Sequence, residues 1–218
     1  TEALLKDVPP VYRTHVNDVL LAALGEALAG WTGSDSVVID LEGHGREEIA
    51  DDLDLSRTVG WFTALFPVRL EIPRGGGPGE LLKAVKEQLR AVPNRGLGYG
   101  LLRYLGDEEA RSRLASQPAP EVVFNYLGQF DEALAQLPAG YRPAREPRGP
   151  ERSPAARRSH SIEVNGGIAG GRLRVQWTYS RALHSRETVQ RVGWSFVDAL
   201  RRIIEHCRAP EAGGVTPS

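Results

Sequence analysis

Several residue types and patterns are scarce in this chain. Its 218 residues contain no methionine and a single cysteine, Cys207. A lone cysteine can form neither an internal disulfide nor a cysteine-based metal cluster, and this favours a reducing compartment. No apolar run approaches the roughly 18 residues of a membrane span, and no charged segment followed by an apolar stretch marks an export signal. We therefore expect a soluble, cytoplasmic protein with no membrane partner.

The chain also lacks an excess of charge. Its 27 Lys and Arg residues nearly balance 28 Asp and Glu residues, so the formal net charge is −1 at pH 7. This balance argues against a nucleic-acid partner. The share of hydrophobic residues, 41%, is ordinary for a globular domain of this length. Because the chain opens at Thr1 without methionine, we expect it to be a piece of a longer polypeptide.

Familiar catalytic motifs are missing as well. There is no Gly-x-Ser-x-Gly elbow, no Walker loop and no Gly-x-Gly-x-x-Gly turn, so the sequence gives no support to hydrolase, nucleotide or dinucleotide sites. None of the five histidines shares metal-ligand spacing with another, so no metal is expected. Cys207 falls on the apolar face of the last predicted helix, where a packed thiol is the expected state.

Hydrophobic periodicity predicts an α/β fold with a mixed sheet flanked by two long helices. The long helices are predicted at Thr14–Trp31, with Thr14 as its cap, and at Ser185–Cys207. A third helix begins at Pro78 and ends at Pro93, and residues 93–100 read as irregular before a short helix through Leu105. Strands are predicted at Ser36–Leu41, Val59–Ile72 and Glu121–Leu127, and a hairpin at Ser161–Ser180.

Two segments are predicted to lie outside the packed core. Residues 131–160 are rich in proline and arginine, and this composition predicts a mobile excursion. Residues 210–218 are typical of an interdomain linker. We therefore expect one lobe over residues 1–209.

A polar segment after the first predicted strand is the best candidate for chemistry. Glu42 follows an apolar run and stands beside Gly43 and Gly45, which allow a tight turn and the close approach of a substrate. At a strand end, burial can raise the pKa of a carboxyl group toward the range of a general base. Glu42 is therefore a candidate catalytic residue, with a structural or turn-forming role as the alternative.

Four motifs resemble those of the epimerization domains of non-ribosomal peptide synthetases, which belong to the condensation superfamily. They occur in the expected order over most of the chain, as DLEGHGRE at 40–47, RTVGWFT with FPV at 57–68, PNRGLGYG with RY at 93–104, and FNYLGQF at 124–130.

The resemblance implies the C-terminal lobe of a chloramphenicol-acetyltransferase-like fold, in which two lobes enclose an active-site tunnel. The family's His-His-x-x-x-Asp motif lies in the N-terminal lobe, and this chain has no adjacent histidines. The lobe alone is therefore expected to be catalytically incomplete, with the N-terminal lobe as its first partner.

The resemblance also implies a reaction, the L to D inversion of the α-carbon of an aminoacyl or peptidyl thioester. The substrate is carried on the phosphopantetheine of a peptidyl carrier domain, the second expected partner, and no cofactor is bound directly. Glu42 and Tyr126 are the implied catalytic residues, and His44, Asn125 and Trp61 the implied substrate-binding residues. Alternatively, Asn125 and Tyr126 only satisfy hydrogen bonds in a buried strand, and Trp61 only holds the lobe together.

Two other functions stay open. The segment at 57–68 also resembles condensation domains, which form the peptide bond. A non-catalytic lobe that docks a carrier domain is the third reading, although such a relative is expected to have lost Glu42.

Overall fold

The computed structural model describes residues 1–47, 54–55, 57–131 and 156–214, with the single positions 138, 144, 146, 149 and 153. Most of the predicted excursion at 131–160 and the last four residues of the predicted linker at 210–218 lie outside the described residues. The structure confirms the α/β class, with a five-stranded mixed sheet flanked by helices.

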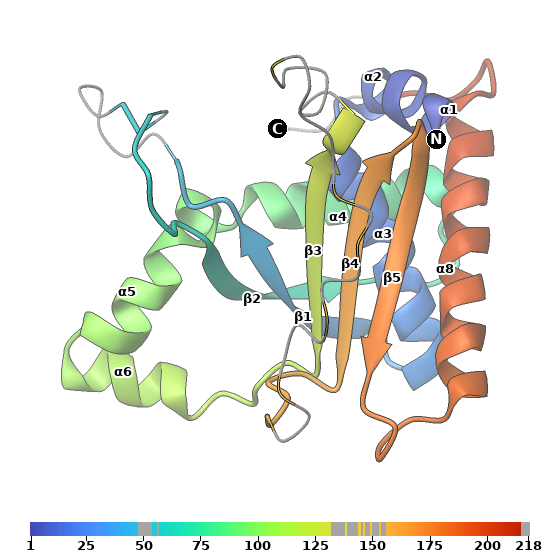
Figure 1. The fold of residues 1–218 in the computed structure, drawn as a ribbon. Helices are drawn as coiled ribbons and strands as arrows, with labels where there is room; N and C mark the ends of the chain where they lie inside the picture. Colours follow the sequence, from blue (N-terminus) through green and yellow to red (C-terminus); the bar gives the residue numbers. More distant parts are fainter. Residues whose placement is uncertain are drawn as a thin grey trace.

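The sheet has the strand order β2-β1-β3-β4-β5 (Figure 1). The strands are β1 (Ser36–Gly43), β2 (Ala64–Glu71), β3 (Val122–Gln129), β4 (Ile162–Ala169) and β5 (Arg172–Tyr179). The central pairs β1–β3 and β3–β4 are parallel, and the outer pairs β1–β2 and β4–β5 are antiparallel. The predicted hairpin is confirmed as β4 and β5, whereas β2 begins at Ala64 rather than at the predicted Val59.

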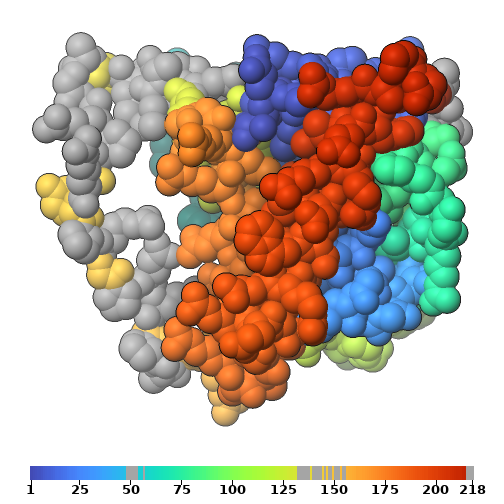
Figure 2. All heavy atoms as spheres, turned by 90° about the vertical axis from the view of Figure 1, so that its right-hand side faces the viewer, coloured from blue at the N-terminus to red at the C-terminus, as the bar shows by residue number. Residues whose placement is uncertain are grey.

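Three helices cover one face of this sheet. They are α3 (Val16–Thr32), α4 (Pro78–Arg90) and α8 (Arg186–Cys207), one more than the two long helices predicted to flank it (Figure 1). In the side view of Figure 2, α8 (red) lies between the β4–β5 hairpin (orange) and the blue and green segments of α3 and α4. Strand side chains alternate between faces, so every second residue enters this core. The core-facing strand residues include Val37, Ile39, Leu41, Val122, Phe124, Ile162 and Val164.

Helices outside this layer were largely missed by the periodicity. The structure adds α1 (Glu2–Lys6), α2 (Val8–Tyr12) and α6 (Glu108–Ala115), all too short for a clear apolar stripe. Residues 93–100, predicted as irregular, form a 3₁₀ turn (η1, Pro93–Gly96) followed by α5 (Leu97–Leu105). The pair α5 and α6 projects beyond β2 in Figure 1. None of the described helices is both long and apolar enough to cross a membrane.

The start of α3 depends on Asp18. His15, and not the predicted Thr14, is the N-cap residue, and its backbone N–H donates to Asp18 Oδ2 at 2.7 Å. The same buried carboxylate pairs with Arg90 in the last turn of α4, at 2.8 Å from Nη2 and 3.2 Å from Nη1. One side chain thus begins α3 and fastens α4 against it.

We expect Asp18→Ala to lower the free energy of unfolding by about 3 to 5 kcal/mol, because it breaks a buried ion pair and leaves the first turn of α3 uncapped. Urea unfolding measures the loss. Glu26→Ala is the control, since it breaks the exposed pair with Arg202 (2.7 Å) and is expected to cost about 1 kcal/mol or less. Equal losses in the two variants would contradict this role of Asp18.

Cys207 is expected to resist alkylation in the folded protein. Its side chain is buried at the end of α8, and burial raises the pKa of the thiol to about 11. At pH 8 the reactive thiolate is then scarce. Mass spectrometry of the tryptic peptide that contains Cys207, after iodoacetamide treatment, measures the modification. Modification as fast in native buffer as in urea-unfolded protein would contradict the packed thiol.

Candidate functional site

Glu42 and Asn125 meet on the face of the sheet that the three helices leave open. Leu41 and Phe124 are register partners in the parallel pair β1–β3, and both side chains enter the core. The next residue on each strand therefore points to the opposite face. There Asn125 Nδ2 donates a hydrogen bond of 2.6 Å to Glu42 Oε2. The first and fourth motifs thus contribute neighbouring side chains.

Glu42 is exposed in this chain, contrary to the expectation of a buried carboxyl group. The physical reason is the position of β1, whose core face packs against helices while its other face is not covered at Glu42 by described residues.

Tyr126 does not share the face of Glu42. It follows Asn125 directly on β3 and packs, partly buried, against the hydrophobic core. A Cβ placed at Gly166 on β4 would be in ordinary contact with its ring, at 3.6 Å. The structure brings together Glu42 and Asn125 but places Tyr126 on the helix side of the strand.

The loop after β1 is held by Arg46. Its guanidinium donates to the carbonyl oxygens of Leu55 (2.5 Å) and Thr58 (2.8 Å) and lies 4.2 Å from the centroid of the Phe62 ring. Gly45 has φ +66°, and a Cβ there would collide with the carbonyl oxygen of Phe62. Glycine is therefore required where the two arms of this loop meet.

His44 and Trp61 lie on this loop. His44 Nδ1 accepts from the Arg46 backbone N–H at 3.0 Å, and its Nε2 is 3.3 Å from Glu47 Oε1. The Trp61 side chain is 91% exposed, and within the described ranges it makes no hydrogen bond or ring contact. A substrate-binding role of these two residues stays a prediction.

A second polar pair on the open face was missed by the motifs. His160 Nε2 lies 2.8 Å from Asp40 Oδ2, and both side chains are buried. Arg158 pairs nearby with the buried Glu163, at 3.5 Å. Alternation along β1 could have placed Asp40 on the face of Glu42, but its partner 120 residues away gave no signal in the sequence.

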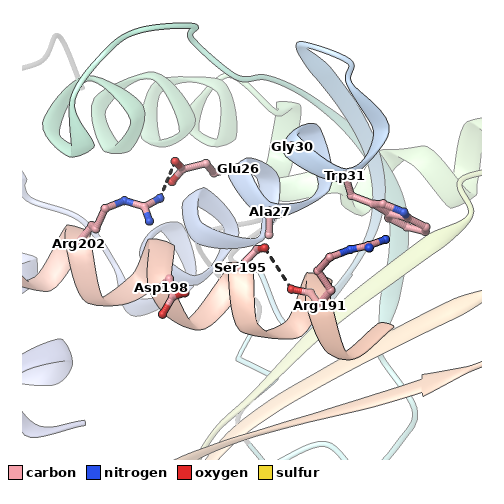
Figure 3. Close-up of a pocket in the computed structure, with 8 residues that line it drawn as sticks. All are labelled: Glu26, Ala27, Gly30, Trp31, Arg191, Ser195, Asp198 and Arg202. Atoms are coloured by element: carbon pink, nitrogen blue, oxygen red, sulfur yellow. Dashed lines mark hydrogen bonds and ion pairs between the residues drawn. The ribbon is translucent and has the colours of Figure 1, made fainter. Parts of the chain in front are cut away.

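Two pockets lie elsewhere on the lobe. A pocket of about 330 Å³ opens between α3 and α8, on the helix side of the sheet (Figure 3). Figure 3 shows its ion pair between Glu26 and Arg202, and the Ser195 hydroxyl donating to the Arg191 carbonyl oxygen. A second pocket, of about 550 Å³, includes the first residues of β1, β3 and β4, whereas Glu42 is near the last residue of β1. Neither pocket includes Glu42.

Comparison with known families identifies the chain. The family model of the condensation domain matches residues 1–217. The chain belongs to the condensation domain family. The resemblance to domains of non-ribosomal peptide synthetases, drawn from the four motifs, is confirmed at this level. Among the described residues of this condensation-family domain, no three His, Cys, Asp or Glu side chains are grouped so that they could hold a metal ion.

Curated relatives are long synthetases of which this domain is a small part. It is 50% identical to a chondramide synthase of Chondromyces crocatus over 213 residues, which is 97% of this chain and 5% of the relative. It is 41% identical to gramicidin S synthase 1 of Brevibacillus brevis over 224 residues, which is all of this chain and 20% of the relative. The similarity therefore concerns one segment of each such protein.

Solved structures agree on the fold. The epimerization domain from the third module of tyrocidine synthetase B is 38% identical with a TM-score of 0.84, and the match covers 94% of this chain and 45% of that one. The first condensation domain of the CDA synthetase is 16% identical with a TM-score of 0.59, covering 95% of this chain and 43% of that one. The second similarity shows the fold alone.

We expect Arg46→Lys to loosen the loop after β1, because a lysine cannot span two carbonyl groups and stack on Phe62 at once. Hydrogen–deuterium exchange, read by mass spectrometry, should become about tenfold faster in peptides covering residues 57–63. Arg69→Lys, on the exposed pair with Glu71 in β2, is the matched control. Unchanged exchange in 57–63 would show that Arg46 does not hold the loop.

Proposed function

We propose that this condensation-family domain contributes Glu42 to the epimerization of a carrier-bound aminoacyl or peptidyl thioester. The observation that carries the proposal is the 2.6 Å hydrogen bond that joins Glu42 and Asn125 on the open face of the sheet. The similarity to the epimerization domain of tyrocidine synthetase B supports it, at 38% identity. The substrate is carried on phosphopantetheine of a carrier domain.

In the proposed reaction, Glu42 acts as an acid and base at the α-carbon. Its carboxylate takes the α-proton, the C–H bond breaks, and the electron pair moves onto the thioester carbonyl as an enolate. An acid on the opposite side then gives a proton to the other face of the α-carbon, and the enolate returns to the thioester. The reverse direction exchanges the two roles, which yields a mixture of L and D forms.

The second acid and base must come from outside this chain. The match covers 45% of the tyrocidine synthetase epimerization domain, and the described face around Glu42 is open. An N-terminal lobe bearing the family's paired histidines is the proposed source. That lobe would also exclude water from Glu42, which strengthens electrostatic stabilisation of an enolate.

The remaining predicted site residues receive different roles in this proposal. Asn125 orients the Glu42 carboxylate through its hydrogen bond. Tyr126 supports the end of β3 from the helix side, where its ring packs on the core. His44 and Trp61 keep their predicted role in this proposal, as exposed residues that contact substrate or the second lobe.

Peptide-bond formation is the second candidate, favoured by the family model itself, whose description is the condensation domain. The two functions differ in what happens to the α-proton. Condensation joins donor and acceptor chains and leaves the α-carbon unchanged. Formation of a peptide bond by the assembled domain, without exchange of the α-proton, would select this function.

We expect Glu42→Gln to reduce α-proton exchange at least ~100-fold in the assembled two-lobed domain, because the amide cannot accept the proton. The assay follows deuterium uptake from solvent by a carrier-bound aminoacyl thioester, using mass spectrometry. Glu205→Gln makes the same chemical change at an exposed position of α8 and should leave exchange unchanged. Full exchange by Glu42→Gln would remove Glu42 from the mechanism.

A further inference from the structure

A row of carboxamide side chains continues the site across the sheet. Asn125 on β3 is the register partner of Asn165 on β4, and Asn165 is the partner of Gln176 on β5. Their strand neighbours Phe124, Val164 and Trp177 face the core, so all three carboxamides lie on the open face. We call Asn125, Asn165 and Gln176 the amide row. Glu42 stands at its β1 end.

The side chains of Asn165 and Gln176 in the amide row have unused hydrogen-bond donors and acceptors. Within the residues that the structure describes, the side chains of Asn165 and Gln176 make no hydrogen bond or ion pair. Asparagine is disfavoured in strands, where β-branched and aromatic residues pack better. Strand preference therefore does not account for Asn125 and Asn165, and residues that break a local preference are expected at functional sites.

The amide row has different borders on its two sides. On one side, the pairs Asp40–His160 and Arg158–Glu163 hold residues 158–160 against the sheet, and Glu163 is buried there. On the other side lies the partly exposed Phe130, whose ring a Cβ at Gly167 would meet at 2.9 Å. As far as the described residues show, the row is thus the first uncovered strip beside a closed part of the face.

We propose that the amide row binds secondary amide groups of the extended chain that presents its α-carbon to Glu42. A carboxamide offers both a donor and an acceptor, which matches the C=O and N–H of a secondary amide. Strands are about 4.8 Å apart, so the row extends roughly 10 Å from β3 to β5, and its far end lies roughly 14 Å from β1 and Glu42. This assignment rests on the proposed function, since it concerns the substrate of the same site.

Two parts of the substrate contain such amides, the pantetheine arm and the peptidyl chain. Both are neutral and extended. On the covered side of the row the carboxylates of Asp40 and Glu163 are already in ion pairs, with His160 and Arg158, and on the other side the cation Arg174 shares the face of Gln176. The row therefore suits amides rather than the ammonium group of a free aminoacyl residue. The two sources are distinguished by the choice of substrate.

The test compares Asn165→Leu and Gln176→Met with Thr178→Val in the assembled domain. Thr178 lies on the same face of β5 as Gln176 but pairs with Glu163, outside the row. Losing one hydrogen bond of ordinary strength should raise KM for α-proton exchange about 3- to 10-fold with kcat within twofold, while Thr178→Val changes neither. Gln176 is exposed on an edge strand, so its variant should fold even if Asn165→Leu does not.

Assays with different substrates show which part of the substrate supplies the amides. An aminoacyl N-acetylcysteamine thioester lacks most of the pantetheine arm, and a dipeptidyl carrier adds a peptide amide to an aminoacyl carrier. If the rise in KM of the row variants disappears with the truncated thioester, the row binds the pantetheine arm. If the rise in KM occurs only with the dipeptidyl carrier, the row binds the peptide.

Binding measured without chemistry separates this proposal from the proposed function. The probe is a carrier domain whose aminoacyl group is attached through a stable amide, and fluorescence anisotropy gives its Kd, with a dipeptidyl version as the second probe. A raised Kd in the row variants, but not in Thr178→Val, supports the row even if Glu42→Gln retains exchange. Wild-type KM and Kd in both row variants, or an equal rise in Thr178→Val, would overturn it.

Discussion

The parallel pairing of β1 with β3 is the constraint on which the candidate site depends. It aligns Leu41 with Phe124 in the core and thereby aligns Glu42 with Asn125 on the other face, although 83 residues separate them in the chain. A shift of either strand by one residue in this register would turn the polar side chain of that strand into the core. The apolar packing that stabilises the lobe therefore also specifies the position of its candidate acid and base.

The uneven covering of the sheet explains why the carboxylate of Glu42 is exposed. Three helices bury one face, and the segment before β4 covers part of the other through the Asp40–His160 pair. Glu42 and the amide row lie next to this covered part. A polar strip on a rigid sheet keeps its geometry without a loop to hold it, and a second protein surface can close over it without rearranging the core.

Much of the fold followed from the sequence, because periodicity is strong where an element packs on the core. The helix α8 begins one residue after the predicted start, and the β4–β5 hairpin has the predicted strands. Short helices such as α6 have no apolar stripe long enough to detect. The loop before β2 was predicted as strand because Val59 and Trp61 are apolar. In the site, the position of Glu42 near a strand end was predictable, but its contact with Asn125 depends on a non-local pairing. The face of Tyr126 could have been predicted, because Tyr126 is two residues after Phe124 and alternate residues of a strand share a face.

The candidate site residues are of two kinds, those on strands and those on a loop. Glu42 and Asn125 are on central strands, so their relative position is as fixed as the backbone ladder that pairs them. His44 and Trp61 are on a loop that depends on Gly45 and on the three contacts of Arg46. Groups that transfer a proton must be within hydrogen-bonding distance of a defined atom, whereas groups that close around a substrate can arrive later. The two candidates on the sheet therefore have a fixed separation, whereas the position of the two loop candidates depends on the contacts of Arg46 and Gly45.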